Sequence, residues 1–193
     1  GDSFALAMRC IRAGYTSVMF DGSALPLAEN IAQTSIVAQP ARAAGVGCEG
    51  EIGYVGYAEG AQSKGTDPIE AAQFAHDTGV NAMAVSVGNV HLQKQAGTGL
   101  DLERIAAIRA MTNVPLVIHG GSGVPIEQRA DLARRGDILK FNIGTELRQV
   151  FGSTLRKNLS LDPQSFDRVS ILSSCESPLI EATRHVVRGL API

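Results

Sequence analysis

Two histidines of the sequence follow consecutive short apolar runs, and their spacing fits a shared metal ion. His91 and His119 lie 28 residues apart, each at the end of a run that indicates a β-strand. Neighbouring parallel strands lie about 4.8 Å apart, so imidazoles at equivalent strand ends can reach one ion. One such histidine alone is more often a hydrogen-bonded structural residue, but two favour a metal. A catalytic zinc usually takes three protein ligands, and the third is not evident here.

Two carboxylates stand at the ends of other apolar runs. Glu51 and Asp21 could bind the same metal or orient a histidine that does. Capping of the following helix or loop explains them equally well. Neither remaining histidine is a good ligand candidate, because His76 is beside Asp77 on a polar helix face and His185 is within the last predicted helix.

Small residues form two turns where an anion could approach the backbone. The turns contain Gly120, Gly121, Ser122 and Gly123 after one strand, and Asn142, Ile143, Gly144 and Thr145 after the next. Backbone N–H groups and a helix N-terminus bind phosphate at such places in barrel enzymes. Glycines also form plain turns, but two such turns on adjacent strands beside a histidine are more specific for phosphate.

The segment 53–65 is rich in glycine, lacks apolar periodicity and is long for a loop between a strand and a helix. These features are typical of a mobile active-site loop. Glu59 lies within it. A charged residue in such a loop is more often simply solvated than catalytic.

Strands and helices alternate along the chain, which predicts a parallel sheet. The predicted strands are Ser17–Phe20, Val46–Glu51, Met83–Val87, Leu116–His119 and Ile138–Ile143. The predicted helices are Phe4–Ala13, Ala24–Ala44, Pro68–Thr78, Leu102–Met111, Ile126–Arg134, Thr145–Leu159 and Pro178–Leu190. Polar and glycine residues cluster after each strand, at the end where a (βα)8 TIM barrel carries its catalytic residues. We therefore expect a barrel rather than an open sheet.

Composition limits the classes of function. With 193 residues and 45% apolar content, the chain can form one domain with a sizeable core. The net charge of −2 and the absence of a Lys/Arg run argue against nucleic-acid or membrane-surface binding. The three cysteines are an odd number without CxxC spacing, so we expect neither a disulfide framework nor a cysteine zinc site, and a cytoplasmic location fits best.

Five phrases, in this order, resemble the strand and loop motifs of the class II (zinc-dependent) fructose-bisphosphate and tagatose-bisphosphate aldolase family: SVMFDGSALPLAENI, CEGEIGYVG, AVSVGNVH, PLVIHGGSG and KFNIGTEL. The resemblance extends from Gly1 to about Leu190. It implies an aldehyde-lyase that cleaves or forms a ketose 1,6-bisphosphate, or a related ketose phosphate, through an enediolate stabilised by zinc. The products of cleavage would be dihydroxyacetone phosphate and an aldehyde.

The resemblance also implies roles for individual residues. His91 and His119 would be two of three zinc ligands, with Glu51 and Asp21 lining the metal site, and Glu59 would be the base of the mobile loop. Asn142 would hydrogen-bond the enediolate. The residues implied in the phosphate site are Gly120, Gly121, Ser122, Gly144 and Thr145, with Gly88 nearby, where a monovalent cation (Na⁺ or K⁺) sometimes binds in the family.

The sequence departs from the family pattern at three positions. Leu92 replaces a glycine after the zinc histidine, Tyr57 replaces a glycine before the loop glutamate, and Gly144 stands where the fructose enzymes often have an acid. Because of the third departure, the resemblance does not define the aldehyde half of the substrate. A zinc-dependent hydrolase of a phosphorylated substrate, or a non-catalytic aldolase-like domain, are alternative functions that these residues permit.

A helical segment precedes the first predicted strand, and five strands do not close an eight-stranded barrel, which typically needs about 250 residues. We therefore expect residues 1–193 to be one partial barrel domain that contains about strands 4 to 8 and the C-terminal helices. The family's third zinc ligand and catalytic aspartate would then lie upstream of Gly1. We expect the complete protein to be a homodimer or homotetramer.

Overall fold

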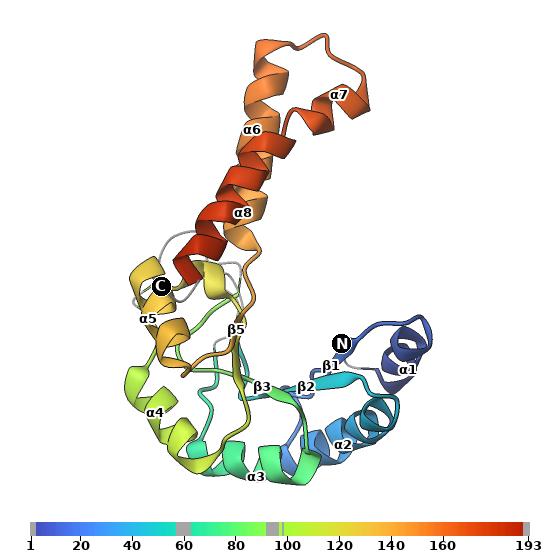
Figure 1. Cartoon of the computed structure of the whole chain (residues 1–193), viewed down its shortest axis with the longest axis vertical. Coiled ribbons are helices and arrows are strands. Elements are labelled where there is room, and N and C mark those ends of the chain that lie inside the picture. The colour runs from blue at the N-terminus through green and yellow to red at the C-terminus, as the bar shows by residue number, and fades with distance from the viewer. Residues whose placement is uncertain (1–2, 57–62, 92–96, 98, 191–193) are drawn as a thin grey trace.

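The computed structural model describes residues 3–56, 63–91, 97 and 99–190. Within these residues the chain forms a curved parallel sheet with helices along its outer side, and Figure 1 shows a long helical arm that extends away from it. The elements are α1 (Phe4–Arg12), β1 (Ser17–Phe20), α2 (Leu27–Ala43), β2 (Gly47–Ile52), α3 (Pro68–Thr78), β3 (Ala82–Val85), α4 (Leu102–Met111), β4 (Leu116–Ile118), the 3₁₀ turn η1 (Gly121–Gly123), α5 (Ile126–Arg135), β5 (Lys140–Phe141), α6 (Thr145–Leu161), α7 (Arg168–Ser173) and α8 (Glu176–Leu190).

The sheet has the strand order β1-β2-β3-β4-β5, and every neighbouring pair among the described strands is parallel. Each strand therefore lies beside the one before it in sequence, with a helix between them. This order is that of consecutive units around a (βα)8 barrel. The predicted five strands and the parallel arrangement are confirmed.

Local sequence explains where the helices begin and end. Asp67 accepts hydrogen bonds from the backbone N–H groups of Ile69 and Glu70, Pro68 occupies the first helical position, and Gly79 ends α3 in the left-handed conformation. The predicted bounds of α3 and α4 are confirmed, whereas α2 begins three residues later than predicted because Pro26 is extended, with φ −56° and ψ 146°.

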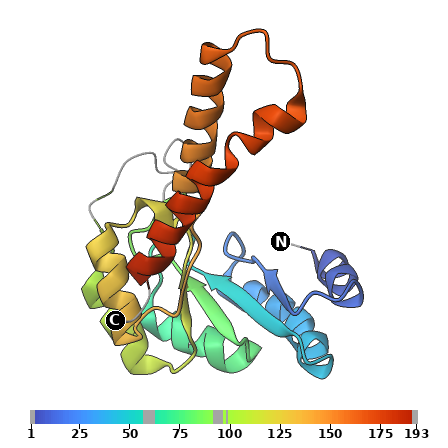
Figure 2. The same cartoon turned by 45° about the horizontal axis from the view of Figure 1, so that its top comes forward.

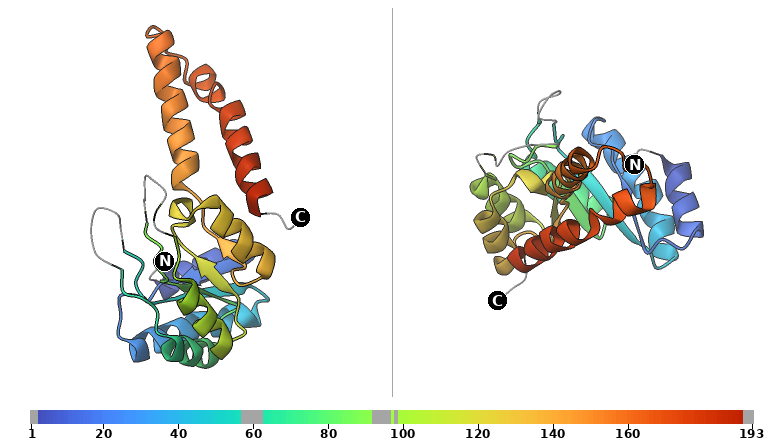
Figure 3. Two further views of the ribbon diagram at one scale, coloured as in Figure 1. Left: turned by 90° about the vertical axis from the view of Figure 1, so that its left-hand side faces the viewer. Right: turned by 90° about the horizontal axis from the view of Figure 1, so that it is seen from above.

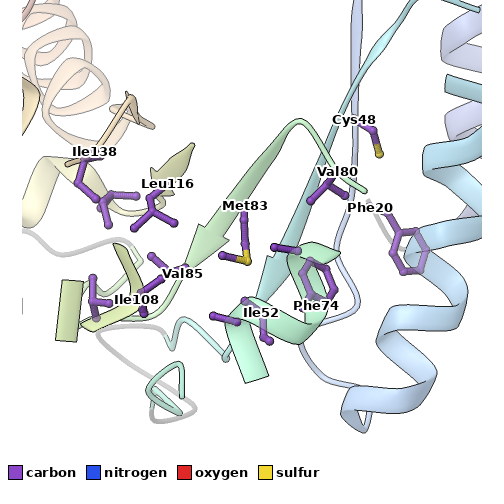
Figure 4. Packing of buried hydrophobic residues seen from close by; sticks show 14 of the residues in the cluster. Phe20, Cys48, Ile52, Phe74, Val80, Met83, Val85, Ile108, Leu116 and Ile138 are labelled. Carbon is purple, nitrogen blue, oxygen red and sulfur yellow. The ribbon is translucent and has the colours of Figure 1, made fainter. Parts of the chain in front are cut away.

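The hydrophobic core lies between the sheet and the helices that follow its strands (Figure 4). Met83 and Ile52 project from neighbouring strands toward Phe74 of α3, and all three are nearly inaccessible to solvent. Gly50 permits this packing, because a Cβ atom there would lie 2.7 Å from the Phe74 ring. The helices thus cover the outer face of the sheet.

Residues that alternate with this core lie on the inner face of the sheet, since successive side chains of a strand point to opposite faces. In β2 these residues are Glu49 and Glu51, which are both buried. The register places Glu49 opposite Ala82 and Glu51 opposite Ala84. The small alanine side chains leave room for two carboxylates inside the curve of the sheet.

Helices α6, α7 and α8 form the arm seen in Figure 1, and Figures 2 and 3 show α8 running back toward the sheet region, where it packs against α5. None of the residues within these three helices, all of which are described, is buried. Phe166, in the connection between α6 and α7, is 93% exposed, and Leu161 is 75% exposed. No helix among the described residues is long and apolar enough to span a membrane.

Candidate active site

His119 is held between two carboxylates of β2. Its Nε2 lies 2.9 Å from Glu49 Oε1 and its Nδ1 lies 3.0 Å from Glu51 Oε2. All three side chains are more than 90% buried. The two glutamates are two residues apart in one strand, so the pleat of the strand directs both toward the same ring.

Lys140 of β5 completes a network across the inner face of the sheet. Its Nζ donates a hydrogen bond of 2.7 Å to Glu49 Oε2, the oxygen that His119 does not contact. Lys140 is half exposed, whereas the Glu49 side chain is 6% exposed. Glu49 thus accepts a hydrogen bond from a cation on each carboxylate oxygen, which is a favourable way to bury a charge.

These contacts set the charges of His119 and Glu49. Burial alone would lower the pKa of His119, but the hydrogen bonds and charges of Glu49 and Glu51 outweigh it and raise the pKa to about 9. Burial alone would raise the pKa of Glu49, but hydrogen bonds from His119 and Lys140 hold it below its ordinary value. At neutral pH, and with no metal bound, His119 is therefore a cation that faces the ionised Glu49.

His91 faces His119 from the loop that follows β3. The ring centroids are 5.9 Å apart and the ring planes are inclined by 42°. Burial lowers the pKa of His91, and the charge of His119 lowers it further. The His91 backbone N–H donates to Gly56 O at 2.8 Å, which ties this loop to the start of the segment after β2. A neutral imidazole is the form of histidine that binds a metal.

The turn after β4 brings the backbone close to the His91 loop. Gly120 has φ +67°, in the left-handed region, and a Cβ atom there would lie 2.3 Å from Val90 O. Only glycine meets both demands. Asn89 also joins the two loops, because its Nδ2 donates to His119 O at 2.9 Å and to Val85 O at 3.2 Å.

The N-terminus of α6 opens into the same place. Ser122 Oγ accepts hydrogen bonds from the backbone N–H groups of Gly144 at 3.2 Å and Glu146 at 3.3 Å. A pocket of about 420 Å³ lies here, lined among the described residues by His91, His119, Gly120, Ser122, Phe141, Asn142, Ile143, Gly144, Thr145 and Arg148. Backbone N–H groups and the helix dipole favour an anion at such a terminus.

The pocket thus places two histidines beside an anion site at the C-terminal end of consecutive parallel strands. The sequence model of the family described as "Fructose-bisphosphate aldolase class-II" matches residues 1–191. The chain belongs to this aldolase family.

Its curated relatives include the protein named fructose-bisphosphate aldolase from Streptococcus pyogenes serotype M1, which is 41% identical over 157 residues. That alignment covers 78% of this chain and 53% of the relative. The protein of the same name from Streptococcus pneumoniae serotype 4 is 39% identical over 155 residues, with the same coverage of each chain. The chain therefore spans about half the length of these relatives.

Solved structures show the same barrel. The YdjI aldolase from Escherichia coli K12 has a TM-score of 0.80 and 29% identity, over 99% of this chain and 66% of that one. A structure described as a putative fructose-1,6-bisphosphate aldolase from Coccidioides immitis has a TM-score of 0.81 and 23% identity, over 98% of this chain and 68% of that one. The fold is that of an aldolase TIM barrel, of which the described residues supply five strands.

The structure brings most of the predicted site residues of this aldolase-family chain together. The predicted residues that line the pocket are His91, His119, Gly120, Ser122, Asn142, Gly144 and Thr145. Gly121 is buried beneath the turn, where its N–H donates to Asn142 O at 3.0 Å. Gly88 has φ +95° in the turn after β3 and is not among the described residues that line the pocket.

The remaining predicted residues have other positions. Glu51 of β2 contacts Nδ1 of His119. Asp21 Oδ1 accepts hydrogen bonds from Ser23 N and Ser23 Oγ at 3.1 and 2.7 Å. Asp21 therefore stabilises its own loop, and its charge also acts on His91. Glu59, Tyr57 and Leu92 lie outside the described residues. His76 is exposed and pairs with Asp77, and His185 lies in α8, away from the site, as predicted.

Sequence reasoning missed four residues near the site: Glu49, Lys140, Asn89 and Arg148. The alternation of β2 was a usable signal for Glu49, because it must share a face with Glu51. Lys140 lies within the predicted strand Ile138–Ile143, and nothing in the local sequence indicates its partner. For Asn89 and Arg148 no local pattern distinguishes them from other loop and helix residues.

The donor set fits part of a zinc site. The two imidazole rings lie 5.9 Å apart and Glu51 contacts His119, and nitrogen and oxygen donors of this kind suit zinc. Among the described residues, however, no group of three or more His, Cys, Asp or Glu side chains is arranged to hold a metal. The described residues thus offer two candidate histidine ligands, and zinc coordination would need a further one.

Proposed function

We propose that the complete protein is a class II aldolase that cleaves or forms a ketose 1,6-bisphosphate, or a related ketose phosphate. The products of cleavage would be dihydroxyacetone phosphate and an aldehyde. The observation that carries this proposal is the shared pocket, in which a pair of histidines lies beside a helix N-terminus and a glycine turn suited to phosphate. A ketose phosphate offers a carbonyl to one part of this pocket and a phosphate to the other.

In this proposal His91 and His119 bind zinc, with Glu51 and Asp21 beside it. The bound zinc would act as a Lewis acid toward the ketose carbonyl and the C3 hydroxyl. The phosphate would lie at the N-terminus of α6, against Gly120, Ser122, Gly144 and Thr145, where its binding energy positions the carbon chain. Gly121 is buried in the turn after β4 and stabilises it through its hydrogen bond to Asn142 O.

Cleavage breaks the C3–C4 bond, leaves the electron pair on C3 and converts the C4 hydroxyl into the aldehyde after loss of its proton. Asn142, which lines the pocket, is proposed to hydrogen-bond the resulting enediolate. Glu59 is proposed to deliver the proton to C3. A Glu59→Gln variant should then lose proton exchange at C3 of dihydroxyacetone phosphate and keep its zinc, and wild-type exchange in this variant would contradict the role.

The metal assignment is tested by replacing each histidine. His91→Ala and His119→Ala should each remove stoichiometric zinc, measured by elemental analysis, and abolish cleavage of fructose or tagatose 1,6-bisphosphate. His76→Ala is the matched control, because that side chain is 88% exposed on α3 and is not among the described residues that line the pocket. Full zinc and full turnover in both variants would refute the assignment.

An enediolate distinguishes an aldolase from a hydrolase. An aldolase incubated with dihydroxyacetone phosphate and an oxidant that traps enediolates should consume the oxidant, whereas a zinc hydrolase should release inorganic phosphate instead. Neither the site geometry nor the relatives favour the hydrolase or the non-catalytic alternative.

A monovalent cation near Gly88 is the second ion of the proposal, and it rests on the family resemblance alone. Turnover that rises with K⁺ or Na⁺ at constant ionic strength would support it. Equal turnover in a large organic cation would contradict it.

We further propose that residues 1–193 are one part of a single barrel domain in a cytoplasmic homodimer or homotetramer. The sheet order and the partial coverage of the structural relatives support the assignment of these residues to part of one barrel domain. Three free thiols, Cys10, Cys48 and Cys175, fit a reducing compartment. The exposed apolar residues of the arm support self-association. Intact mass and light scattering of the natural protein test size and assembly.

A further inference from the structure

The buried Glu49 and the half-exposed Lys140 belong to a network that the proposed chemistry does not use. Neither residue lines the pocket among its described residues, yet Glu49 contacts one ring nitrogen of His119 and Lys140 contacts Glu49. Burial of the Glu49 carboxylate costs desolvation energy, so its ion pairs are weak evidence for a purely stabilising role. The question is what the pair does for His119.

The two nitrogens of His119 differ in their surroundings. The Nε2 side holds Glu49 and, behind it, the ammonium group of Lys140 at 2.7 Å from Glu49 Oε2. The Nδ1 side holds Glu51, which lies two residues nearer than Glu49 to the C-terminal end of β2. The loop that carries His91 follows the parallel strand β3 at the same end of the sheet. The Nδ1 side of the ring therefore faces the end of the sheet that carries the second histidine.

A divalent ion shared with His91 would be attracted to the Nδ1 side and repelled from the Nε2 side by the nearby ammonium group. Each oxygen of Glu49 already faces a cationic side chain, so a further cation there would be repelled. The backbone of His119 is fixed independently, by the hydrogen bond from Asn89 Nδ2 to His119 O at 2.9 Å. The remaining freedom of the side chain is the orientation and tautomer of its ring.

We propose that Glu49, held by Lys140, is a positioning residue that accepts the Nε2–H of His119 and thereby commits Nδ1 to the metal. A carboxylate on the far nitrogen of a metal-binding histidine fixes its tautomer and strengthens it as a ligand. Lys140 fixes the carboxylate in turn, from the far end of the sheet. This inference rests on the proposed zinc site.

The tautomer can be observed directly in the unmodified protein. The complete protein, isotope-labelled at its histidine ring nitrogens and loaded with zinc, should give an NMR spectrum in which His119 has a protonated Nε2 and a metal-bound Nδ1. The sequence has only four histidines, and loss of signals in His119→Asn assigns the ring. A metal-bound Nε2 with a protonated Nδ1 would overturn the inference.

Zinc affinity, measured by competition with a chelator, tests the two positioning residues. Glu49→Ala should weaken zinc binding by about 10-fold to 100-fold. Lys140→Met should weaken it less, and Lys140→Arg should restore it, because a guanidinium can still hold the carboxylate. Lys157→Met is the matched control, since Lys157 is exposed on α6. Unchanged affinity in Glu49→Ala would refute the positioning role.

The outcomes also separate this inference from the proposed activity. Zinc bound through Nδ1 in a protein that does not cleave ketose bisphosphates supports the positioning role and contradicts the aldolase reaction. Zinc bound through Nε2 in an active aldolase supports the aldolase reaction and contradicts the positioning role. A wild-type protein that binds no zinc contradicts both.

Discussion

At the scale of single residues, Gly120 is the closest point between the loops that carry the two histidines. Its left-handed φ and the Val90 carbonyl oxygen exclude a side chain for separate reasons. Gly120→Ala should cost about 2–4 kcal/mol of unfolding free energy, from the backbone and the collision together. Chemical denaturation of the variant measures this cost.

Gly136→Ala is the matched control for this prediction. Gly136 has a similar φ of +73°, but a Cβ atom there would meet nothing within 4 Å. This control should therefore lose only the backbone contribution, about 1–2 kcal/mol. Equal losses in the two variants would show that the contact with Val90 O does not constrain the turn.

Cys48 is expected to be chemically inert although it is next to Glu49. Burial raises the pKa of the Cys48 thiol to about 11, and the charge of Glu49 adds to the effect. The thiolate that attacks an alkylating reagent is therefore scarce at pH 8. Iodoacetamide at pH 8, followed by peptide mass mapping, should label the partly exposed Cys10 and leave Cys48 unmodified until the protein is denatured.

The same pKa shift affects stability at high pH. Because the pKa of Cys48 is raised in the folded state, the unfolded thiol ionises at a lower pH than the folded one, and this ionisation favours the unfolded state. Stability should thus decline as pH rises from about 9 toward 11, and Cys48→Ala should reduce that decline. Rapid labelling of native Cys48 at pH 8 would contradict both expectations.

The sequence singled out residues that lie together in the structure where a residue type has few uses. His91 and His119 could be selected because imidazoles at strand ends are uncommon, and the structure brings their rings together. Glu49 was missed because its importance depends on a partner 91 residues away in sequence, Lys140. Pairings across several strands depend on the register and curvature of the sheet, which local patterns do not contain.

At the scale of elements, α6 is fixed to the barrel by an ion pair with α5. Arg129 NH1 donates to Glu146 Oε1 at 2.6 Å, and the Arg129 side chain is 5% exposed while that of Glu146 is 30% exposed. Glu146→Ala leaves the buried guanidinium without its carboxylate and should cost about 2–3 kcal/mol, less than for a fully buried pair. Thermal and chemical denaturation measure the loss.

A double-mutant cycle isolates this contact. Arg129→Met alone removes the charge that needs compensation, so adding Glu146→Ala to it should cost much less than Glu146→Ala in the wild type. Because the N-terminus of α6 forms the pocket, Glu146→Ala should also weaken the binding of inorganic phosphate. Additive losses in the cycle would show that the two side chains are not coupled.

Elements with strong end signals could be predicted closely, and those formed by tertiary contacts could not. The helix Pro68–Thr78 has a capping aspartate, a first-turn proline and a terminal glycine, and its predicted bounds are those observed. The last predicted strand, Ile138–Ile143, shortens to Lys140–Phe141 because pairing with β4 extends over only two residues. Helix α7 was missed, since six residues carry too little periodicity.

At the scale of the whole molecule, the arm of α6, α7 and α8 exposes several large apolar side chains, and contiguous apolar surface of this kind marks interaction sites. The large exposed apolar residues of this arm are Leu159, Leu161, Phe166, Val169, Leu172, Ile180 and Val187. We expect the double variant Leu161→Ser, Phe166→Ser to dissociate the proposed homo-oligomer without unfolding the barrel, because neither side chain contributes to the core.

Light scattering of the variant over a range of concentrations measures the dissociation, and circular dichroism checks the fold. Ile69→Ser is the matched control, because Ile69 is 67% exposed but lies on α3, away from the arm. An unchanged molar mass in the arm variant, or an equal change in the control, would show that subunits associate elsewhere.

The sequential order of the strands has a consequence for how this molecule is made. Each described strand is hydrogen-bonded only to strands that are adjacent in sequence, so every new strand–helix unit finds its docking surface on the unit synthesised just before it. Such a chain can fold vectorially as it leaves the ribosome, with short loop closures and low contact order. The network between Glu49 and Lys140 is the exception, because it forms only after β5 has been added. The ionic network is therefore completed late in folding, because it can form only when the preceding units are already in register.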